Sequence, residues 1–237
     1  MIQTEGIFVG GSAISAPIIG KDFNWTGGDG TYQVLDDGGG NWRIKFLSSG
    51  TFTPLKNMVV DAFLVGAGGG AGSSYCGAGG AGYTTTVRSV VLTANTAYSI
   101  VVGAAGTNGN PSSAGGETTA FTASAAGGKN TSNGTSSSKR PGGAGGSGGA
   151  GYVSPVATTT GGTDGGDGTS SATTGGKGQG TTTREFGEAD GTLYASGGGS
   201  NLTATVSNSG NGGRNGITSI EPADGIVVIR QHKEVAA

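Results

Sequence analysis

The chain has 237 residues, of which 54 are glycine, and a formal net charge of −2. Glycine averages roughly 7% of residues in proteins, so this chain is strongly enriched in glycine. Collagen is nevertheless excluded, because only 6 residues are proline and no strict Gly-X-Y period runs along the chain. Disordered chains usually carry high charge, whereas this chain is 12% charged and contains clear apolar strands. We therefore expect a folded protein, and the lack of a basic stripe argues against a nucleic-acid partner.

The first residues carry neither a basic segment nor a long apolar run, so we expect no signal peptide. No stretch approaches the ~18 apolar residues of a membrane span, so we expect no membrane insertion. Cys76 is the single cysteine, which excludes an intrachain disulfide framework. These features predict a protein made in a cytoplasm that reaches the outside by lysis or as part of a particle.

The first 65 residues are the least glycine-biased and hold the first strand signals. Trp42, Ile44 and Phe46 alternate with basic residues, which predicts a half-buried strand over residues 41–47. Residues 58–65 form an apolar run that predicts a strand buried on both faces.

Further along, residues 87–92 and 97–102 flank a four-residue turn and predict a β-hairpin. Residues 225–230 predict a last apolar strand. No amphipathic helical pattern is present, so the expected fold class is all-β without α-helix.

Three segments follow from these patterns. Residues 1–50 lack the glycine periodicity and contain both tryptophans, so we expect an N-terminal attachment region there. Residues 51–231 are expected to form a glycine-rich β domain, and residues 232–237 a short tail.

Between residues 66 and 225 lie 43 of the 54 glycines, and here a period of three is visible. Residues 142–151 repeat Gly-Gly-small. A polyproline-II-type helix has three residues per turn and no internal hydrogen bonds, and glycine edges would let several such helices pack closely and pair their backbones. The sequence thus predicts a small antiparallel β-sandwich base carrying a bundle of polyglycine-II helices, with residues 142–151 central and ~30 Å long. The alternative is a flexible Gly/Ser linker.

Strands before and after this insertion require its runs to alternate between outward and return directions. On this basis residues 77–82 and 210–216 are expected to be return runs. The intervening turns should then gather at one far end of the bundle; they are residues 73–76, 107–111, 129–141, 169–174 and 200–209.

Side chains in these turns serve no visible core, and loops on a rigid scaffold often carry recognition residues. A tyrosine could stack on a sugar ring, asparagines could bond hydroxyl groups, and cations could meet phosphate. The candidate receptor-binding residues are Tyr75, Asn108, Asn110, Lys129, Asn130, Asn133, Lys139, Arg140, Asn201 and Asn208.

Enzymatic signals are weak. Residues 66–71 match the dinucleotide-binding fingerprint, but no helix can follow them to bind a pyrophosphate. Glu185, Glu188 and Asp190 could supply a glycosidase acid pair, although a polar turn beside Phe186 explains them more simply. We predict no catalytic residue.

Metal and cofactor signals are equally poor. Asp164 and Asp167 lack the further acidic ligands of a calcium site. His232 is the only histidine, so a zinc site with Cys76 is not expected. We predict no cofactor and no metal.

Several segments resemble the glycine-rich domain of phage and prophage tail proteins. They are Phe-Thr-Pro at residues 52–54, Val-Asp-Ala-Phe-Leu-Val-Gly-Ala-Gly-Gly-Gly at 60–70, Gly-Gln-Gly-Thr-Thr-Thr-Arg-Glu-Phe-Gly-Glu at 178–188 and Gly-Ile-Val-Val-Ile-Arg at 225–230. The resemblance covers about residues 40–231. The expected architecture is also similar to the distal adhesins of T-even-like tail fibres.

This resemblance implies a non-catalytic, host-recognising protein located in a virion or tail-like particle. Its implied partners are a bacterial surface glycan or protein receptor, and a tail-fibre or baseplate protein. The oligomeric state stays open, a homo-oligomer included. Two alternatives also stay open: a surface-glycan depolymerase, and a purely structural or ice-binding glycine-rich protein.

Overall fold

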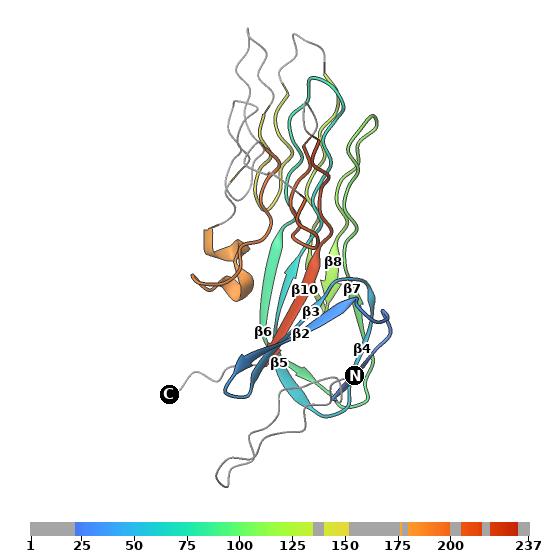
Figure 1. The fold of residues 1–237 in the computed structure, drawn as a ribbon, viewed down its shortest axis with the longest axis vertical. Helices are drawn as coiled ribbons and strands as arrows, with labels where there is room; N and C mark the ends of the chain where they lie inside the picture. Colours follow the sequence, from blue (N-terminus) through green and yellow to red (C-terminus); the bar gives the residue numbers. More distant parts are fainter. Residues whose placement is uncertain are drawn as a thin grey trace.

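The computed structural model describes residues 22–134, 140–151, 176, 180–199, 205–214 and 219–231. Two five-stranded antiparallel sheets form the base, and the glycine-rich runs project from one end of it (Figure 1). The described residues contain no α-helix, only the short 3-10 helices η1 (Gly180–Thr183) and η2 (Glu185–Gly187). The predicted all-β class is confirmed.

Each sheet combines strands from distant parts of the sequence. The first sheet has the order β1 (Phe23–Trp25), β4 (Gly50–Pro54), β7 (Tyr98–Val101), β8 (Thr118–Ala120) and β9 (Ala123–Ala125). The second has the order β2 (Tyr32–Gly38), β3 (Asn41–Phe46), β10 (Ile226–Gln231), β5 (Met58–Val65) and β6 (Thr84–Leu92).

The main core lies between the two sheets. The alternation in β3 has the predicted effect, since Trp42, Ile44 and Phe46 are buried while the residues between them are partly exposed. Aromatic rings from both sheets meet there, with Phe46 and Phe52 at 5.5 Å between centroids.

Strand β5 is buried on both faces, as predicted. One face contributes Ala62 and Leu64 to the core between the sheets. The other contributes Phe63 and Val65 to a second cluster, which is covered by residues 183–195. Two-sided burial explains the continuous apolar sequence of this strand.

The hairpin predicted from residues 87–92 and 97–102 is wrong. Strand β6 pairs with β5 in the second sheet, whereas β7 pairs with β4 and β8 in the first. The four intervening residues therefore carry the chain across the end of the sandwich. Asn95 adopts a left-handed conformation there, and its N–H donates to Pro54 O.

The boundary expected at residue 50 falls at the first residue of β4. Strands before it pair with strands after it, since β1 pairs with β4 and β3 pairs with β10. Residues 22–50 are therefore part of the two sheets.

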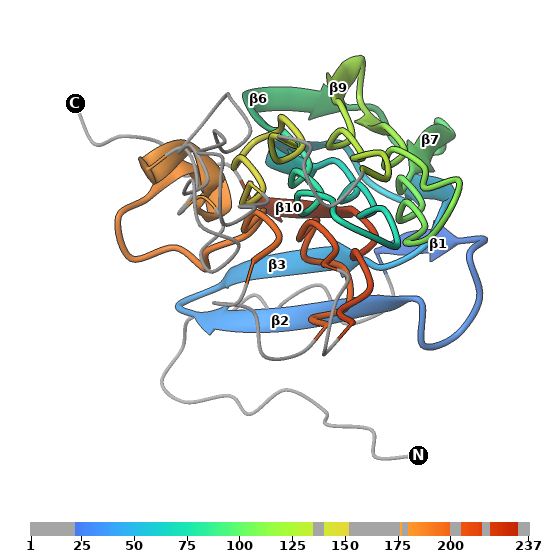
Figure 2. The same cartoon turned by 90° about the horizontal axis from the view of Figure 1, so that it is seen from above.

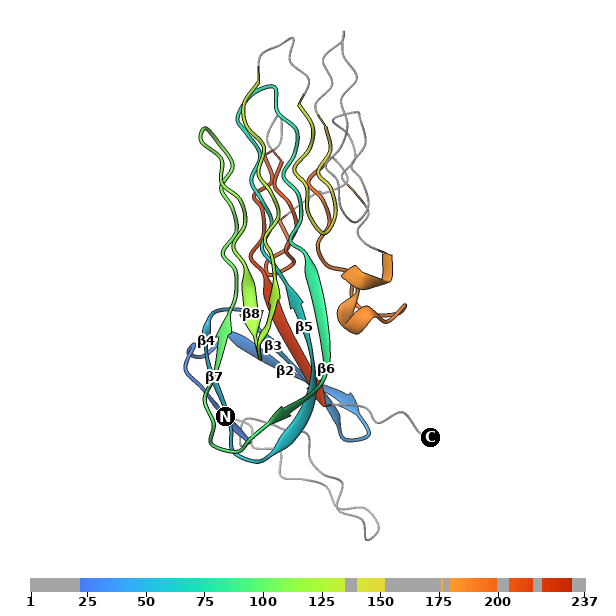
Figure 3. The same ribbon diagram turned by 180° about the vertical axis from the view of Figure 1, so that it is seen from behind.

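The glycine-rich runs from residue 66 onward lie side by side above the sandwich (Figure 3). Residues 66–72 leave the base and 77–82 return beside them, with Gly69 N–H donating to Gly80 O at 2.8 Å. Residues 103–109 run outward and 113–116 return. Viewed from above, the runs gather over the end of the base, with β2 on one side and β6 on the other (Figure 2).

Hydrogen bonds between the runs repeat every third residue. The N–H groups of Gly66 and Gly69 donate to one run, at Tyr83 and Gly80. Those of Ala67 and Gly70 donate to a second run, at Gly116 and Ser113, and that of Gly68 donates to Ala223 in a third. N–H groups three residues apart in the outward run therefore donate to the same neighbouring run.

The spacing between the runs requires glycine. A Cβ atom on Gly79 would lie 1.9 Å from Gly69 O, and one on Gly82 would lie 1.8 Å from Gly66 O. Real Cβ atoms essentially never come within 3.0 Å of such an atom. The backbones therefore touch at distances that no other residue type allows.

Residues 142–151 do not form the single long pass that was predicted. They reverse direction at residues 145–147, because Gly143 N–H donates to Ala78 O while Ala78 N–H donates to Ala150 O. The Gly-Gly-small repeat continues through this bend without a change of composition, so the bend could not be predicted from the residues.

The direction assigned to residues 210–216 is also wrong. Gly210 N–H donates to Asp224 O at the base, and Gly213 N–H donates to Gly69 O further out. Residues 210–214 therefore run outward, and residues 219–224 return. The turn predicted at residues 169–174 lies outside the described residues.

Close packing of the runs makes a clear prediction for Gly79→Ala. The new methyl group would meet backbone atoms that cannot move independently, so we expect a loss at or above the upper end of the ~1–3 kcal/mol typical of overpacking. Urea unfolding followed by tryptophan fluorescence measures it.

Gly40→Ala is the control, because a Cβ there meets nothing within 4 Å although φ is +80°. Its cost should be only the ~1–2 kcal/mol of a left-handed alanine. Equal losses for the two variants would contradict the packing account.

Candidate binding surface at the far end

Three turns converge at the end of the runs farthest from the sandwich (Figure 1). Gly72 and Gly109 form a parallel bridge, which joins the turns at 73–76 and 107–111. Asn133 adds the third segment, because its Oδ1 accepts from Ser73 N–H at 2.6 Å and its Nδ2 donates to Ser73 Oγ at 2.9 Å. The predicted meeting of these three segments is confirmed.

Two of the candidate residues at this end face solvent. Tyr75 is 46% exposed and adopts a left-handed backbone conformation at φ 48°. Asn110 is exposed and precedes the cis peptide bond to Pro111. Both residues are therefore accessible from solvent at this end of the runs.

Two other asparagines hold the turns together. The Oδ1 of Asn108 accepts from Ala71 N–H at 2.8 Å, and its Nδ2 donates to Ile220 O at 2.9 Å. Asn133 binds the backbone of the turn at 73–76 through Ser73 and Ser74. Their amide groups stabilise the surface that Tyr75 and Asn110 present.

Lys129 and Asn130 lie along an outward run, below the turn to which they were assigned. Lys129 N–H donates to Ala144 O at 2.8 Å, and Lys129 O accepts from Gly80 N–H at 2.9 Å. The Lys129 side chain is exposed, whereas Asn130 Nδ2 donates to Ser112 O. The outward run therefore continues past residue 128, where the prediction had ended it.

Asn208 is at the base, so its placement in a tip turn is wrong. Its Nδ2 donates to Leu47 O and Gly225 O, both at 2.9 Å. The error follows from the reversed direction of residues 210–214. Arg140 lies beside Ser132, with its Nη1 donating to Ser132 Oγ at 3.5 Å. Lys139 and Asn201 lie outside the described residues.

Glu185 and Glu188 belong to an ion cluster at the base. Glu185 is 2% exposed, and its carboxylate accepts from Arg43 Nη1 at 2.6 Å and lies 3.7 Å from Lys45 Nζ. Glu188 pairs with Arg230 at 2.7 Å. Glu185 and Glu188 are thus each paired with a cation in the segment beside Phe186.

This cluster fastens residues 183–195 to the second sheet. Arg230 also stacks over the Phe186 ring, with its guanidinium carbon 4.1 Å from the centroid. Burial raises the pKa of the Tyr194 hydroxyl, and the neighbouring Glu185 carboxylate raises this pKa further. Hydrogen bonding to Asp37 and Glu185 raises the pKa of Arg43 despite its partial burial. In the sequence, this cluster is indicated by Arg43 and Lys45, the basic residues that alternate with apolar ones in the predicted strand at 41–47.

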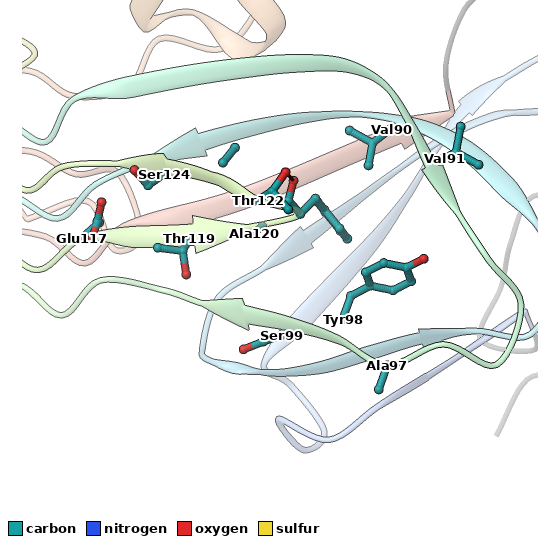
Figure 4. Close-up of a pocket in the computed structure, with 12 residues that line it drawn as sticks. Val90, Val91, Ala97, Tyr98, Ser99, Glu117, Thr119, Ala120, Thr122 and Ser124 are labelled. Carbon is teal, nitrogen blue, oxygen red and sulfur yellow. Dashed lines mark hydrogen bonds between the residues drawn. The ribbon is translucent and has the colours of Figure 1, made fainter.

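A groove of about 660 Å³ opens between the edge strands β6 and β9 (Figure 4). Val90, Val91 and Tyr98 line it, with hydroxyl groups of Thr119 and Ser124 on the opposite side. It was not predicted, since its residues come from separate strands.

The turn beside the groove is strained. Phe121 and Thr122 both have positive φ, at 51° and 67°, in the two-residue turn between β8 and β9. Such turns favour Asn and Gly. Packing compensates here, because the buried Phe121 ring lies 5.8 Å from that of Tyr98.

Within the described part of the chain, no three His, Cys, Asp or Glu side chains are grouped as metal ligands would be. No helix in that part is long and apolar enough to cross a bilayer.

The family comparison covers most of this architecture. A family described as a glycine-rich domain matches residues 47–230, from the residue after β3 to the residue before the end of β10. The chain belongs to this glycine-rich domain family. The match covers both the paired runs and the strands that hold them, so the glycine-rich domain includes most of the sandwich. No curated protein matches the sequence.

The ion cluster predicts a large effect of Glu185→Gln. The variant leaves Arg43 and Lys45 beside a neutral side chain under residues 183–195, so we expect the free energy of unfolding to fall by about 2–3 kcal/mol. Urea unfolding at neutral pH measures this change.

Asp22→Asn provides the matched control, because the Asp22–Lys56 pair has side chains that are 32% and 54% exposed. Exposed pairs contribute at most about 1 kcal/mol. If Glu185→Gln cost no more than Asp22→Asn, the cluster would not be what fastens this segment.

Proposed function

We propose that this protein is a tail protein of a phage or phage-derived particle that recognises a bacterial surface without catalysis. A surface glycan or protein receptor would bind at the far end of the glycine-rich runs, and a tail-fibre or baseplate protein would hold the other end. The protein would be made in the host cytoplasm and act on the released particle. The resemblance to glycine-rich phage tail proteins supports this context.

We further propose that the runs are polyglycine-II helices packed as a bundle. The three-residue repeat of hydrogen bonds supports this, because a helix with three residues per turn presents the same edge at every third residue. Successive N–H groups of Gly68, Gly69 and Gly70 donate to three different neighbours, at Ala223, Gly80 and Ser113. A flat sheet would offer only two neighbours.

The observation that carries the recognition proposal is the joined set of turns at the far end. Asn108 and Asn133 bind backbone groups of neighbouring segments, which fixes turns that contribute no apolar core. Rigid loops lose little conformational entropy when a ligand binds. Tyr75, at 46% exposure, offers an aromatic face suited to a sugar ring or a protein surface.

Binding of the labelled full chain to a panel of whole bacterial cells tests this role. For a strain that binds, Tyr75→Ala should weaken binding by about tenfold, which corresponds to loss of one aromatic contact of ~1.4 kcal/mol. Periodate treatment of the cells should remove a glycan receptor, and protease treatment a protein receptor.

Lys56→Ala is the control, since Lys56 is exposed at the base and its single ion pair is a surface one. Its binding should match that of the unmodified chain. Loss of binding in Lys56→Ala together with full binding in Tyr75→Ala would reverse the proposed orientation.

A further inference from the structure

A small cavity of about 240 Å³ lies beside the far end, between residues 129–132 of an outward run and residues 140–144 of the next run. Pockets for whole drug-sized ligands usually measure ~300–1,000 Å³. The cavity therefore suits a single compact chemical group better than a complete sugar ring with its substituents.

The lining of this cavity is cationic. Lys129 and Arg140 contribute to it, and no acidic residue does. Within the described part of the chain, neither side chain takes part in an ion pair, in contrast to Arg43, Arg88 and Arg230 at the base. Two cations without a counter-charge beside one cavity favour a negatively charged occupant.

Arg140 also has an unsatisfied donor. Its Nε is buried and has no hydrogen-bond partner among the residues that the structure describes, and its Nη1 donates to Ser132 Oγ at 3.5 Å. Buried donors are nearly always paired, and leaving a charged one unpaired is costly. An oxyanion that accepts from Nε would remove this cost, and the planar guanidinium is well matched to phosphate oxygens.

The opposite wall is held in place by its own contacts. Asn130 Nδ2 donates to Ser112 O and Ser112 Oγ, both at 2.9 Å. Thr131 is buried, and its hydroxyl accepts from Gly72 N–H at 3.2 Å. The cavity thus has a rigid polar wall facing the guanidinium.

We infer that this cavity binds a phosphate group, with Arg140 and Lys129 as its ligands. The inference rests on the proposed function only for the source of that group, which would be a phosphodiester of an anionic bacterial surface polymer. The phosphate would contact Arg140 Nε and the Lys129 ammonium, while the rest of the polymer would extend over the far-end surface.

Titration of the ¹⁵N-labelled full chain with inorganic phosphate, against chloride at equal ionic strength, tests the site directly. The Arg140 Nε–Hε resonance should shift and saturate with phosphate and stay unchanged with chloride. Arg140→Lys keeps the positive charge but loses the planar set of guanidinium N–H donors. The Kd for phosphate, followed through the backbone amides of residues 129–132, should therefore rise about tenfold. Lys129→Gln should raise it by a smaller factor, and Lys56→Gln should leave it unchanged.

A second arm uses a glycerol-phosphate polymer and the same cells as above. A polymer that binds more tightly than inorganic phosphate identifies the polymer as the source. Saturable phosphate binding without cell binding would keep this site and remove the proposed function. Tyr75-dependent cell binding with no phosphate-induced shift, or with equal shifts in Arg140→Lys, would overturn this site and keep the proposed function.

Discussion

Everything above the sandwich depends on the approach of one backbone to another without intervening side chains. A Cβ on Gly68 would stand 1.8 Å from Asn211 O, and one on Gly70 would stand 1.9 Å from Thr107 O. At this separation the N–H and C=O groups of neighbouring runs meet directly. Ordering so much glycine has a high entropic cost, which the hydrogen bonds between runs and their mutual contacts must offset.

The sandwich supplies the apolar burial that the runs lack. Strand β5 lies at the centre of this connection, because it carries both clusters and continues directly into the first run at Gly66. Strand β10 receives the last run and pairs with both β5 and β3. Both ends of the glycine-rich insertion are therefore anchored in adjacent central strands, which fixes where the runs begin.

The sequence predicts the parts of this structure in which burial selects the type of side chain, and it predicts the glycine runs less well. The alternation in β3 and the apolar run of β5 predicted their burial correctly, because burial selects side-chain type. The first outward and return runs were also correct, since Ser73 to Cys76 mark their turn in composition. The prediction missed the bend at residues 145–147 and the base position of Asn208. A glycine run has the same composition whether it leads away from the base or returns to it, so its direction cannot be inferred from residue type. The prediction also missed the crossing from β6 to β7. A turn that links strands of two different sheets has the same residue types as a turn that links two paired strands of a hairpin.

Hydrogen bonds connect each run to several different neighbours with a period of three, and solution NMR on the labelled chain can test this pattern. Scalar couplings across hydrogen bonds identify donor and acceptor together. We expect couplings from the amides of Gly68, Gly69 and Gly70 to the carbonyls of Ala223, Gly80 and Ser113, with slow hydrogen exchange at all three amides. Fast exchange at these amides, or couplings confined to one neighbouring run, would contradict it.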